Sequence, residues 1–438
     1  MNLRKRSSRI LREEVVSATL PCGLTCHVIP KRGFSKKVAI LSARYGSIDL
    51  AFTPDGQERL ETPPGIAHFL EHQLFKKAGG EDVLMEFGRT GASSNAFTDY
   101  CSTAYYFTGS GEFEKNLDLL LSFVSSPYFE AENVAKEKLI IEQELRMYED
   151  SPDHRLYKNL TGILYSVHPV RIDIGGEVSD IQKIDRDLLE KCYRMFYNMS
   201  NMALVVAGDV LPENVFEIAN RALPADRFRA AGPIARHLPE EPAGVKERVV
   251  RAQMEVSRPR ILIGFKDLDT GGRRALEREF QSSVVLDLLF GRSSSFYTRH
   301  YEQGLIDDSF SFSYNGEDAF GFSLIGGESD QPERLAEEIL LELHKARKQG
   351  FRESDIERSR RKRLGKFIRS FDTPDGTAFL VLGCVQRGID PFRASQVIAK
   401  LSAGALESRL EKHFDERNYA VSILMPKKAE DPAGAARI

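Results

Sequence analysis

The sequence predicts an α+β fold built from two homologous repeats, each a largely antiparallel sheet with helices packed on one face. Segments rich in β-branched and aromatic residues precede and interrupt segments of helical periodicity, an order typical of helices layered on a sheet. The 438 residues are enough for two or more domains that each bury a core. A short sequence near the end of the first half also recurs near the C-terminus, which indicates a duplicated unit.

The first half begins with strands and continues with alternating helices and strands. Strands are expected at residues 14–20, 24–30, 37–45, 103–108 and 202–207. Helices are expected at residues 82–89, 113–124, 131–148 and 185–196. A further helix follows Thr62 and Pro63, where Thr62 is expected to cap the first N–H groups and Pro63 to occupy the first turn.

The duplication sets the domain boundaries. Asn201-Met202-Ala203-Leu204-Val205 is echoed by Asn418-Tyr419-Ala420-Val421-Ser422. A stretch rich in proline and alanine separates the two copies and has the composition of a linker. We therefore expect an N-terminal domain over residues 1–225, a linker over 226–248 and a C-terminal domain over 249–438.

The run His68-Phe69-Leu70-Glu71-His72 is the strongest candidate for chemistry. His68 and His72 are one helical turn apart, so both imidazoles can reach one metal ion from the same face. Glu71 lies beside them, where a carboxylate could act as a general base on a metal-bound water. The alternative is a solvated helix face that carries two histidines and an acid.

A third ligand is expected from the amphipathic helix at residues 131–148. Glu137 and Glu144 are seven residues apart, two turns, and therefore share a face. One of them could bind the metal while the other supports it. The alternative is an ordinary charged helix surface in a chain with 64 acidic residues.

These motifs together resemble the inverted-zincin metallopeptidases, the family of pitrilysin, insulysin and the mitochondrial processing peptidase. The resemblance runs from about residue 23 to the C-terminus and is strongest to bacterial single-chain, two-repeat members similar to the catalytic subunit of the processing peptidase. The matching segments are His68-x-x-Glu71-His72, Ser94-Asn95-Ala96-Phe97-Thr98, Thr103-Ala104-Tyr105-Tyr106, and Glu137 followed by Glu144.

The resemblance implies a function and a role for each residue. His68, His72 and Glu144 would hold one Zn²⁺ per chain, Glu71 would be the catalytic base, and Glu137 would assist it. Glu142 is a weaker rival as third ligand. The expected protein is a hydrolase, a zinc metalloendopeptidase that cleaves peptides or unfolded protein segments. The alternative is a non-catalytic structural or core subunit of a processing-peptidase-like assembly.

The resemblance also implies how substrate binds. Asn95, Ala96 and Phe97 correspond to the family's substrate-binding edge. An extended peptide that adds to an edge strand gains main-chain hydrogen bonds without strict sequence demands. Broad specificity on unstructured peptides is therefore expected.

The second repeat lacks the zinc ligands. Superposing the repeats places Asp287 against Glu71, and Ser359 and Lys366 against Glu137 and Glu144. In the segment that follows the Ser293-Ser294 turn, relatives often carry an arginine and a tyrosine that help to hold the substrate carbonyl. Arg299, His300 or Tyr301 could substitute, or this segment could simply be a helix end that packs on the sheet.

The composition of the chain limits the kinds of binding partner and the cellular compartment that can be expected. A net charge of −3 gives no reason to expect nucleic acid, and no apolar run is long enough to span a bilayer. The five scattered cysteines favour a reducing compartment, and the basic N-terminus lacks an apolar core, so a cytoplasmic protein is expected.

Two repeats are half of the family's clamshell chamber. The resemblance therefore implies a homodimer, or a heterodimer with a related chain that lacks the zinc motif.

Overall fold

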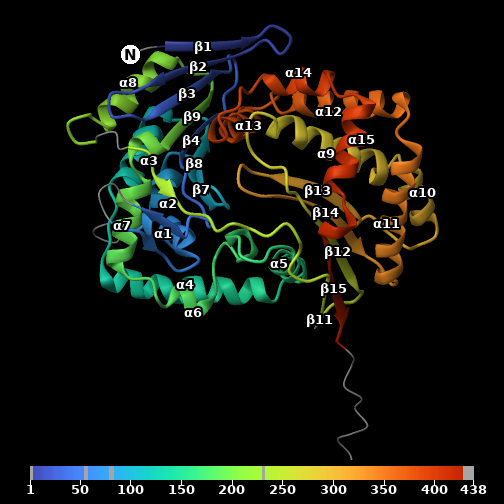
Figure 1. Cartoon of the computed structure of the whole chain (residues 1–438). Coiled ribbons are helices and arrows are strands. Elements are labelled where there is room, and N and C mark those ends of the chain that lie inside the picture. Colours follow the sequence, from blue (N-terminus) through green and yellow to red (C-terminus); the bar gives the residue numbers. More distant parts are fainter. Residues whose placement is uncertain (1–2, 54–57, 78–82, 229–231, 428–438) are drawn as a thin grey trace, which may run out of the picture. The chain divides into compact units, whose positions relative to one another are not determined.

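The computed structural model describes residues 3–53, 58–77, 83–228 and 232–427, which form two compact units (Figure 1). Unit 1 comprises Met1–Arg146, His168–Glu240 and Lys362–Ile398. Unit 2 comprises Met147–Val167, Glu241–Arg361 and Ala399–Ile438. Each half of the chain thus contributes one segment to the unit formed mainly by the other half.

Unit 1 is built on a seven-stranded sheet in which every neighbouring pair is antiparallel except β3 and β9. In spatial order its strands are β1 (Leu3–Ser8), β2 (Glu13–Thr19), β3 (Thr25–Pro30), β9 (Met202–Gly208), β4 (Lys37–Ala43), β8 (Thr103–Gly109) and β7 (Ser93–Thr98). A small sheet joins β10 (Ala235–Arg236), β5 (Ala51–Thr53) and β6 (Leu60–Glu61). β7 and β1 are the edges of the large sheet, so β7 has one unpaired side.

Unit 2 repeats five adjacent strands of this sheet. Its strands are ordered β11 (Val249–Met254), β15 (Tyr419–Pro426), β12 (Arg260–Lys266), β14 (Gly321–Glu328) and β13 (Ser311–Gly316). The pair β11 and β15 is parallel and the other pairs are antiparallel, the same pattern as β3-β9-β4-β8-β7. The predicted duplication and the largely antiparallel α+β fold are therefore confirmed.

Helices pack against each sheet. In unit 1 they are α1 (Ile66–Leu74), α2 (Val83–Arg89), α3 (Phe113–Ser125), α4 (Ala131–Glu149), α6 (Val178–Ile181), α7 (Arg186–Phe196) and α8 (Pro212–Ala222), with η1 (Pro169–Arg171) and η2 (Met199–Asn201). In unit 2 they are α5 (Pro152–Leu164), α9 (Ala275–Phe290), α10 (Ser295–Glu302), α11 (Pro332–Gln349), most of α12 (Glu353–Arg369), α15 (Ala403–His413) and η3 (Glu416–Asn418). Buried apolar side chains of helices and sheet form one core in each unit.

Two segments, Met147–Val167 in unit 2 and Lys362–Ile398 in unit 1, are each contributed by the other half of the chain. These exchanged segments add a layer of helices that was not predicted from the sequence. α13 (Pro374–Gln386), which precedes α14 (Arg393–Ala399), packs against β9 and β4. Tyr106 contacts Phe379 of α13, whereas its neighbour Tyr105 contacts Phe123 of α3. Adjacent residues of a strand point to opposite faces, so α13 covers the face opposite α3. Conversely, α5 from the first half packs on β12 and β15 of unit 2.

A buried lysine fastens the exchanged segment to unit 1. Lys31 Nζ lies 2.5 Å from Glu13 Oε1 and also donates to the main-chain carbonyl of Phe371.

Each compact unit combines segments from both halves of the chain. The predicted domain boundaries at residues 225 and 249 therefore remain a prediction. The predicted linker is divided between the two units after Glu240.

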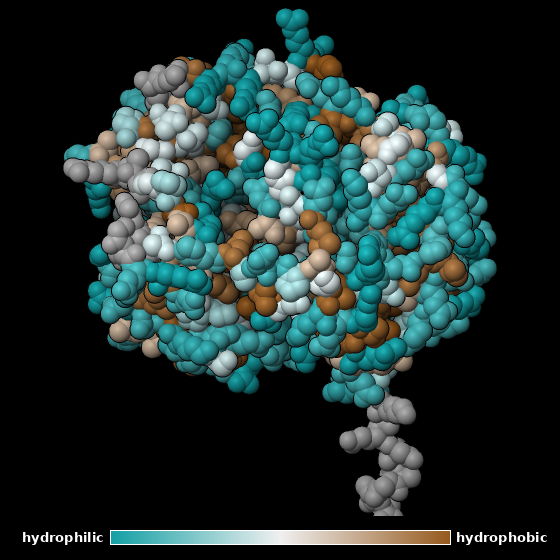
Figure 2. All heavy atoms as spheres, viewed as in Figure 1, coloured by the Kyte–Doolittle hydropathy of each residue, from teal (hydrophilic) through white to brown (hydrophobic). Residues whose placement is uncertain are grey.

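The surface is dominated by polar residues on the face shown in Figure 2, where hydrophobic residues are scattered among them. Within the described ranges, none of the helices combines the length and the apolar character that a membrane span requires. The five cysteines Cys22, Cys26, Cys101, Cys192 and Cys384 are free thiols.

Candidate metal centre

The helix that carries His68 and His72 begins differently from the prediction. α1 starts at Ile66, and its N-cap is Gly65 in the left-handed conformation with φ of 84°, not Thr62. The Thr62 hydroxyl instead donates to the Leu50 carbonyl at 3.2 Å. The predicted Thr62 cap is therefore wrong, because the N-cap lies three residues later, at Gly65.

Gly65 is required by both conformation and space. A Cβ atom on Gly65 would lie 2.3 Å from the Gly175 carbonyl oxygen, far inside contact distance. A second glycine at the same junction, Gly176, also has positive φ, and its Cβ would lie 2.7 Å from the Pro64 carbonyl oxygen. The loop at residues 173–176 therefore packs directly on the start of α1 and fixes its position.

Replacing Gly65 with alanine is expected to destabilise the protein by more than about 1 kcal/mol, because alanine at positive φ is strained even before the clash is counted. Gly88 in α2 is a matched control, since a Cβ there meets no atom within 4 Å. Gly88→Ala is expected to leave stability unchanged or to raise it by up to about 1 kcal/mol. Chemical denaturation measures both, and equal effects of the two changes would contradict this account.

His68, His72 and Glu144 come together at the contact between α1 and α4. His72 Nε2 lies 3.3 Å from Glu144 Oε2, and His68 Nε2 lies 3.8 Å from Glu144 Oε1. One donor atom from each of the three lies within 4.8 Å of the others, and among the described residues no other His, Cys, Asp and Glu side chains form such a group. Tetrahedral zinc with bonds of about 2.1 Å places its donors about 3.4 Å apart. The spacing and the nitrogen and oxygen donors therefore fit zinc.

Glu137 lies behind this cluster. Its side chain is 3% exposed, its Oε1 is 3.0 Å from His72 Nδ1, and its Oε2 is 3.0 Å from Lys76 Nζ. Because Nδ1 of His72 faces Glu137, Nε2 is directed to the cluster. A histidine ligand is commonly oriented in this way by a carboxylate on its other nitrogen.

Glu71 projects from α1 toward the end of β7. It is almost buried, and its Oε2 accepts a hydrogen bond of 2.5 Å from the Thr98 hydroxyl. Thr98 Oγ1 is also 3.2 Å from Thr103 Oγ1. Two strands therefore orient the Glu71 carboxylate, and no role was predicted for Thr98 itself. The strand alternation that separates Thr98 from Phe97 was the signal that could have identified it.

Burial and the neighbouring carboxylates perturb the charges of the cluster. Burial, with the nearby His72, lowers the pKa of His68 to about 4. Burial acts to lower the pKa of His72 as well, but Glu137 and Glu144 outweigh it and raise the pKa to about 9. Burial raises the pKa of Glu71, while His72 and Lys76 hold the pKa of Glu137 below its usual value despite burial. The carboxylates thus favour positive charge at the point where the three donors meet.

The predicted substrate contacts lie on β7, an edge strand that packs against α1. Asn95 is exposed, and its Oδ1 accepts from the Ala96 N–H at 2.8 Å. Phe97 contacts Tyr106 and Phe379, which places its ring on the face of the sheet opposite Thr98. The predicted residues therefore belong to an open edge strand, and two of them are directed away from Glu71.

Arg299, His300 and Tyr301 all belong to α10 of unit 2. His300 is buried, its ring is 4.4 Å from that of Phe296, and its Nε2 is 3.5 Å from Glu338. Arg299 Nη2 is 3.7 Å from Glu342, and Tyr301 stacks on Tyr297. Each has a structural partner within its own unit, as expected for a helix end that packs on its surroundings. A role with substrate remains a prediction.

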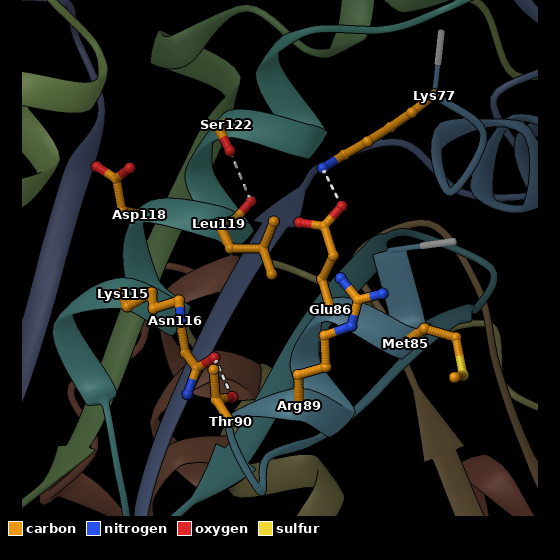
Figure 3. Close-up of a pocket in the computed structure, with 10 residues that line it drawn as sticks. All are labelled: Lys77, Met85, Glu86, Arg89, Thr90, Lys115, Asn116, Asp118, Leu119 and Ser122. Atoms are coloured by element: carbon orange, nitrogen blue, oxygen red, sulfur yellow. Dashed lines mark hydrogen bonds and ion pairs between the residues drawn. The ribbon is translucent and has the colours of Figure 1, made fainter. Parts of the chain in front are cut away.

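A cavity of 670 Å³ lies between α2 and α3 (Figure 3). Lys77 pairs with Glu86 at 3.0 Å across it, and Thr90 donates to Asn116 Oδ1 at 2.7 Å. None of the described residues that line it is a predicted ligand or substrate contact. The cavity is therefore separate from the metal centre.

The chain is similar to peptidases over nearly its whole length. Residues 58–177 match the family model described as insulinase (peptidase family M16), and residues 183–363 match the model described as peptidase M16 inactive domain. An uncharacterized zinc protease, YmfH of Bacillus subtilis, is 41% identical over 95% of this chain and 98% of its own length.

Solved structures agree with this similarity. The crystal structure of an M16-like peptidase from Alicyclobacillus acidocaldarius is 34% identical, has a TM-score of 0.91, and covers 98% of this chain and 99% of its own. Pitrilysin has a TM-score of 0.76 at 16% identity. It covers 98% of this chain, which matches 47% of pitrilysin's own length. At that identity the likeness to pitrilysin concerns the fold alone.

Proposed function

Because the chain belongs to the insulinase (M16) family of peptidases, we propose that it is a zinc-dependent endopeptidase acting on peptides or unfolded protein segments. The observation that carries this proposal is the convergence of His68, His72 and Glu144, with Glu71 on the same helix turn. Two nitrogen donors and one carboxylate form a typical ligand set for a hydrolytic zinc site that keeps a fourth position open.

His68 Nε2, His72 Nε2 and the Glu144 carboxylate are the proposed zinc ligands, one ion per chain. A zinc ion held there supplies a Lewis acid that polarises the scissile carbonyl and acidifies water at neutral pH. The helix contact between α1 and α4 holds the three donors in place before any substrate arrives.

Glu71 is the proposed general base. It accepts a proton from the attacking water and then delivers it to the amine of the leaving peptide. Burial raises the pKa of Glu71 above that of an exposed carboxyl group, which makes the carboxylate a stronger base, while the hydrogen bond from Thr98 keeps it oriented. Thr98 is thus a positioning residue for Glu71.

Glu137 is proposed to support the ligand set through His72 without touching zinc. Glu137→Gln should weaken zinc binding by roughly 10- to 100-fold, the usual cost of losing such an outer partner. The measurement is competition for zinc with a chelator of known affinity. Lys76→Met provides a comparison, because it removes the other partner of Glu137 but leaves the bond to His72. An unchanged affinity in Glu137→Gln would exclude the proposed role.

Substrate is proposed to add to the free edge of β7 as a further strand. Main-chain pairing at this edge places the peptide beside α1, because α1 packs against β7. Asn95, Ala96 and Phe97 are the proposed contacts, with side chains directed alternately to the two faces of the sheet. Such binding requires an extended peptide, which explains a preference for unfolded segments.

The function is tested by incubating the purified chain with an unstructured peptide and with a compact folded domain. Cleavage of the peptide that a chelator abolishes and added zinc restores would support the proposal. Equal cleavage of the folded domain would contradict strand addition, whereas cleavage that a chelator does not affect would contradict a zinc enzyme. A non-catalytic subunit is the alternative, and it would show neither activity nor stoichiometric zinc.

We also propose that the chain works in a pair. It spans about half the length of pitrilysin, so a second two-repeat chain would complete an enclosure around the substrate. Sedimentation with and without a related chain that lacks the zinc motif, coupled to a peptide assay, measures this. Activity should rise with assembly into a homodimer or heterodimer, and full activity in a stable monomer would refute the pairing. A cytoplasmic location remains part of the proposal, and the free cysteines agree with it.

A further inference from the structure

A cavity of 340 Å³ lies over β1, β2 and β3 of unit 1, far along the sheet from the metal centre. Its floor is formed by three strands and its wall by the segment that contains α13. The lining residues are Arg4, Arg6, Val15, Ser17, Ala18, Thr19, Thr25, His27, Val385 and Pro391. All belong to unit 1.

Strand register places the polar side chains of this cavity on one face. Arg4 is opposite Ser17, and Ser17 is opposite His27, so the three form a row across the strands. Thr19 is opposite Thr25, with their hydroxyl oxygens 3.3 Å apart. Because residues two apart share a face, the cavity floor presents two guanidinium groups, an imidazole and three hydroxyls together.

His27 lines this floor, and one of its ring nitrogens has no partner. Its Nδ1 is 2.8 Å from Ser17 Oγ, whereas its buried Nε2 has no hydrogen-bond partner in the described structure. Burial, reinforced by Arg6, lowers the pKa of His27 to about 4, so the ring is neutral at physiological pH. When the Ser17 hydroxyl donates to Nδ1, Nε2 carries the hydrogen and is a free donor.

The charged groups around the cavity leave one cation unopposed. Arg4 makes no hydrogen bond or ion pair with any residue that the structure describes. Arg6 lies 3.7 Å from Asp390, and on the same face Glu13 is held by Lys31 at 2.5 Å. The acidic groups nearby are thus matched by other cations, and the guanidinium of Arg4 gives the cavity a net positive charge.

We propose that this cavity binds a small oxyanion, a carboxylate or a phosphate group carried by a small molecule. Arg4 donates two parallel hydrogen bonds to the anion, His27 Nε2–H donates a third, and the hydroxyls of Ser17, Thr19 and Thr25 complete the shell. Val15, Val385 and Pro391 contact the apolar part of the ligand. The volume suits a small molecule rather than a folded partner.

The experiment is a calorimetric titration of the full chain with inorganic phosphate and, separately, with succinate at low ionic strength. Saturable binding of phosphate alone identifies a phosphate site, and saturable binding of succinate identifies a carboxylate site; either result supports the proposal. Arg4→Gln is expected to weaken binding by roughly ten- to a hundredfold, the effect of losing a charge-assisted hydrogen bond.

Lys5→Gln is the matched control, because Lys5 is the next residue of β1, points to the other face and pairs with Glu14. It removes the same charge and should leave binding within about twofold, since an exposed ion pair contributes little. Whichever of phosphate and succinate saturates the site should also raise the melting temperature of wild type and Lys5→Gln but not of Arg4→Gln. Failure of both anions to saturate, or equal loss of binding in the two variants, overturns the proposal.

Discussion

Replacing Glu71 with glutamine is expected to leave the zinc content of the chain unchanged and to lower the rate of peptide cleavage by about a hundred- to ten-thousandfold. Glutamine keeps the size of the side chain and can still contact Thr98, but its amide cannot accept the proton. Zinc is retained because the three proposed ligands are untouched. Metal analysis and a steady-state assay on the same preparation measure the two quantities.

Thr98→Val provides the comparison for Glu71→Gln. It removes the hydroxyl that donates to Glu71 at 2.5 Å but leaves the base itself in place. A smaller loss of activity is therefore expected, confined to turnover, with zinc content again unchanged. If Glu71→Gln cleaved peptides at the wild-type rate, Glu71 would not be the base.

Glu144→Gln is expected to lose both zinc and activity. Removing a charged ligand from a three-residue site should weaken zinc binding by more than the roughly 10- to 100-fold expected for an outer partner such as Glu137. The chain should still fold, because Glu144 is partly exposed on α4 and contributes little to the core. Metal content after dialysis, compared with circular dichroism, separates loss of zinc from loss of structure.

Glu142→Gln is the control for this change, because Glu142 is the rival acid on the same helix. It pairs with Arg146 at 2.6 Å on the surface and is absent from the cluster of donors. It should therefore keep wild-type zinc and activity. Loss of zinc in Glu142→Gln but not in Glu144→Gln would reverse the assignment of the third ligand.

The residues of the candidate site could be predicted because their spacing is local. His68 and His72 are one turn apart on α1, and Glu137 and Glu144 are two turns apart on α4, so helical periodicity alone aligns each pair. That the two helices meet could not be derived from periodicity. It came from the resemblance, and the structure places His72 between Glu137 and Glu144.

Features that depend on distant segments could not be predicted in this way. Thr62 followed by proline has the local signature of a helix cap, yet the loop at residues 173–176 packs on Gly65 and moves the start of α1 to Ile66. β1 is a strand only because β2 pairs with it, since its own sequence is polar and exposed. The exchange of α5 and α13 between units likewise follows from packing partners far away in sequence.

The second repeat shows what remains when the ligands are lost. Asp287 on α9 and Ser359 on α12 occupy the positions aligned with Glu71 and Glu137, and Ser359 Oγ donates to Asp287 Oδ2 at 2.9 Å. Both side chains are buried, so the pair joins the two helices as His72 and Glu137 join α1 and α4. The helix contact is thus retained with a neutral donor in place of a metal ligand set.

An X-ray structure of the zinc-loaded Glu71→Gln chain, with anomalous data collected at the zinc edge, directly tests the proposed metal site. One anomalous peak per chain is expected, within about 2.0–2.2 Å of His68 Nε2, His72 Nε2 and a Glu144 carboxylate oxygen. A chain that binds no zinc at saturating concentration, or a peak coordinated by other residues, would contradict it.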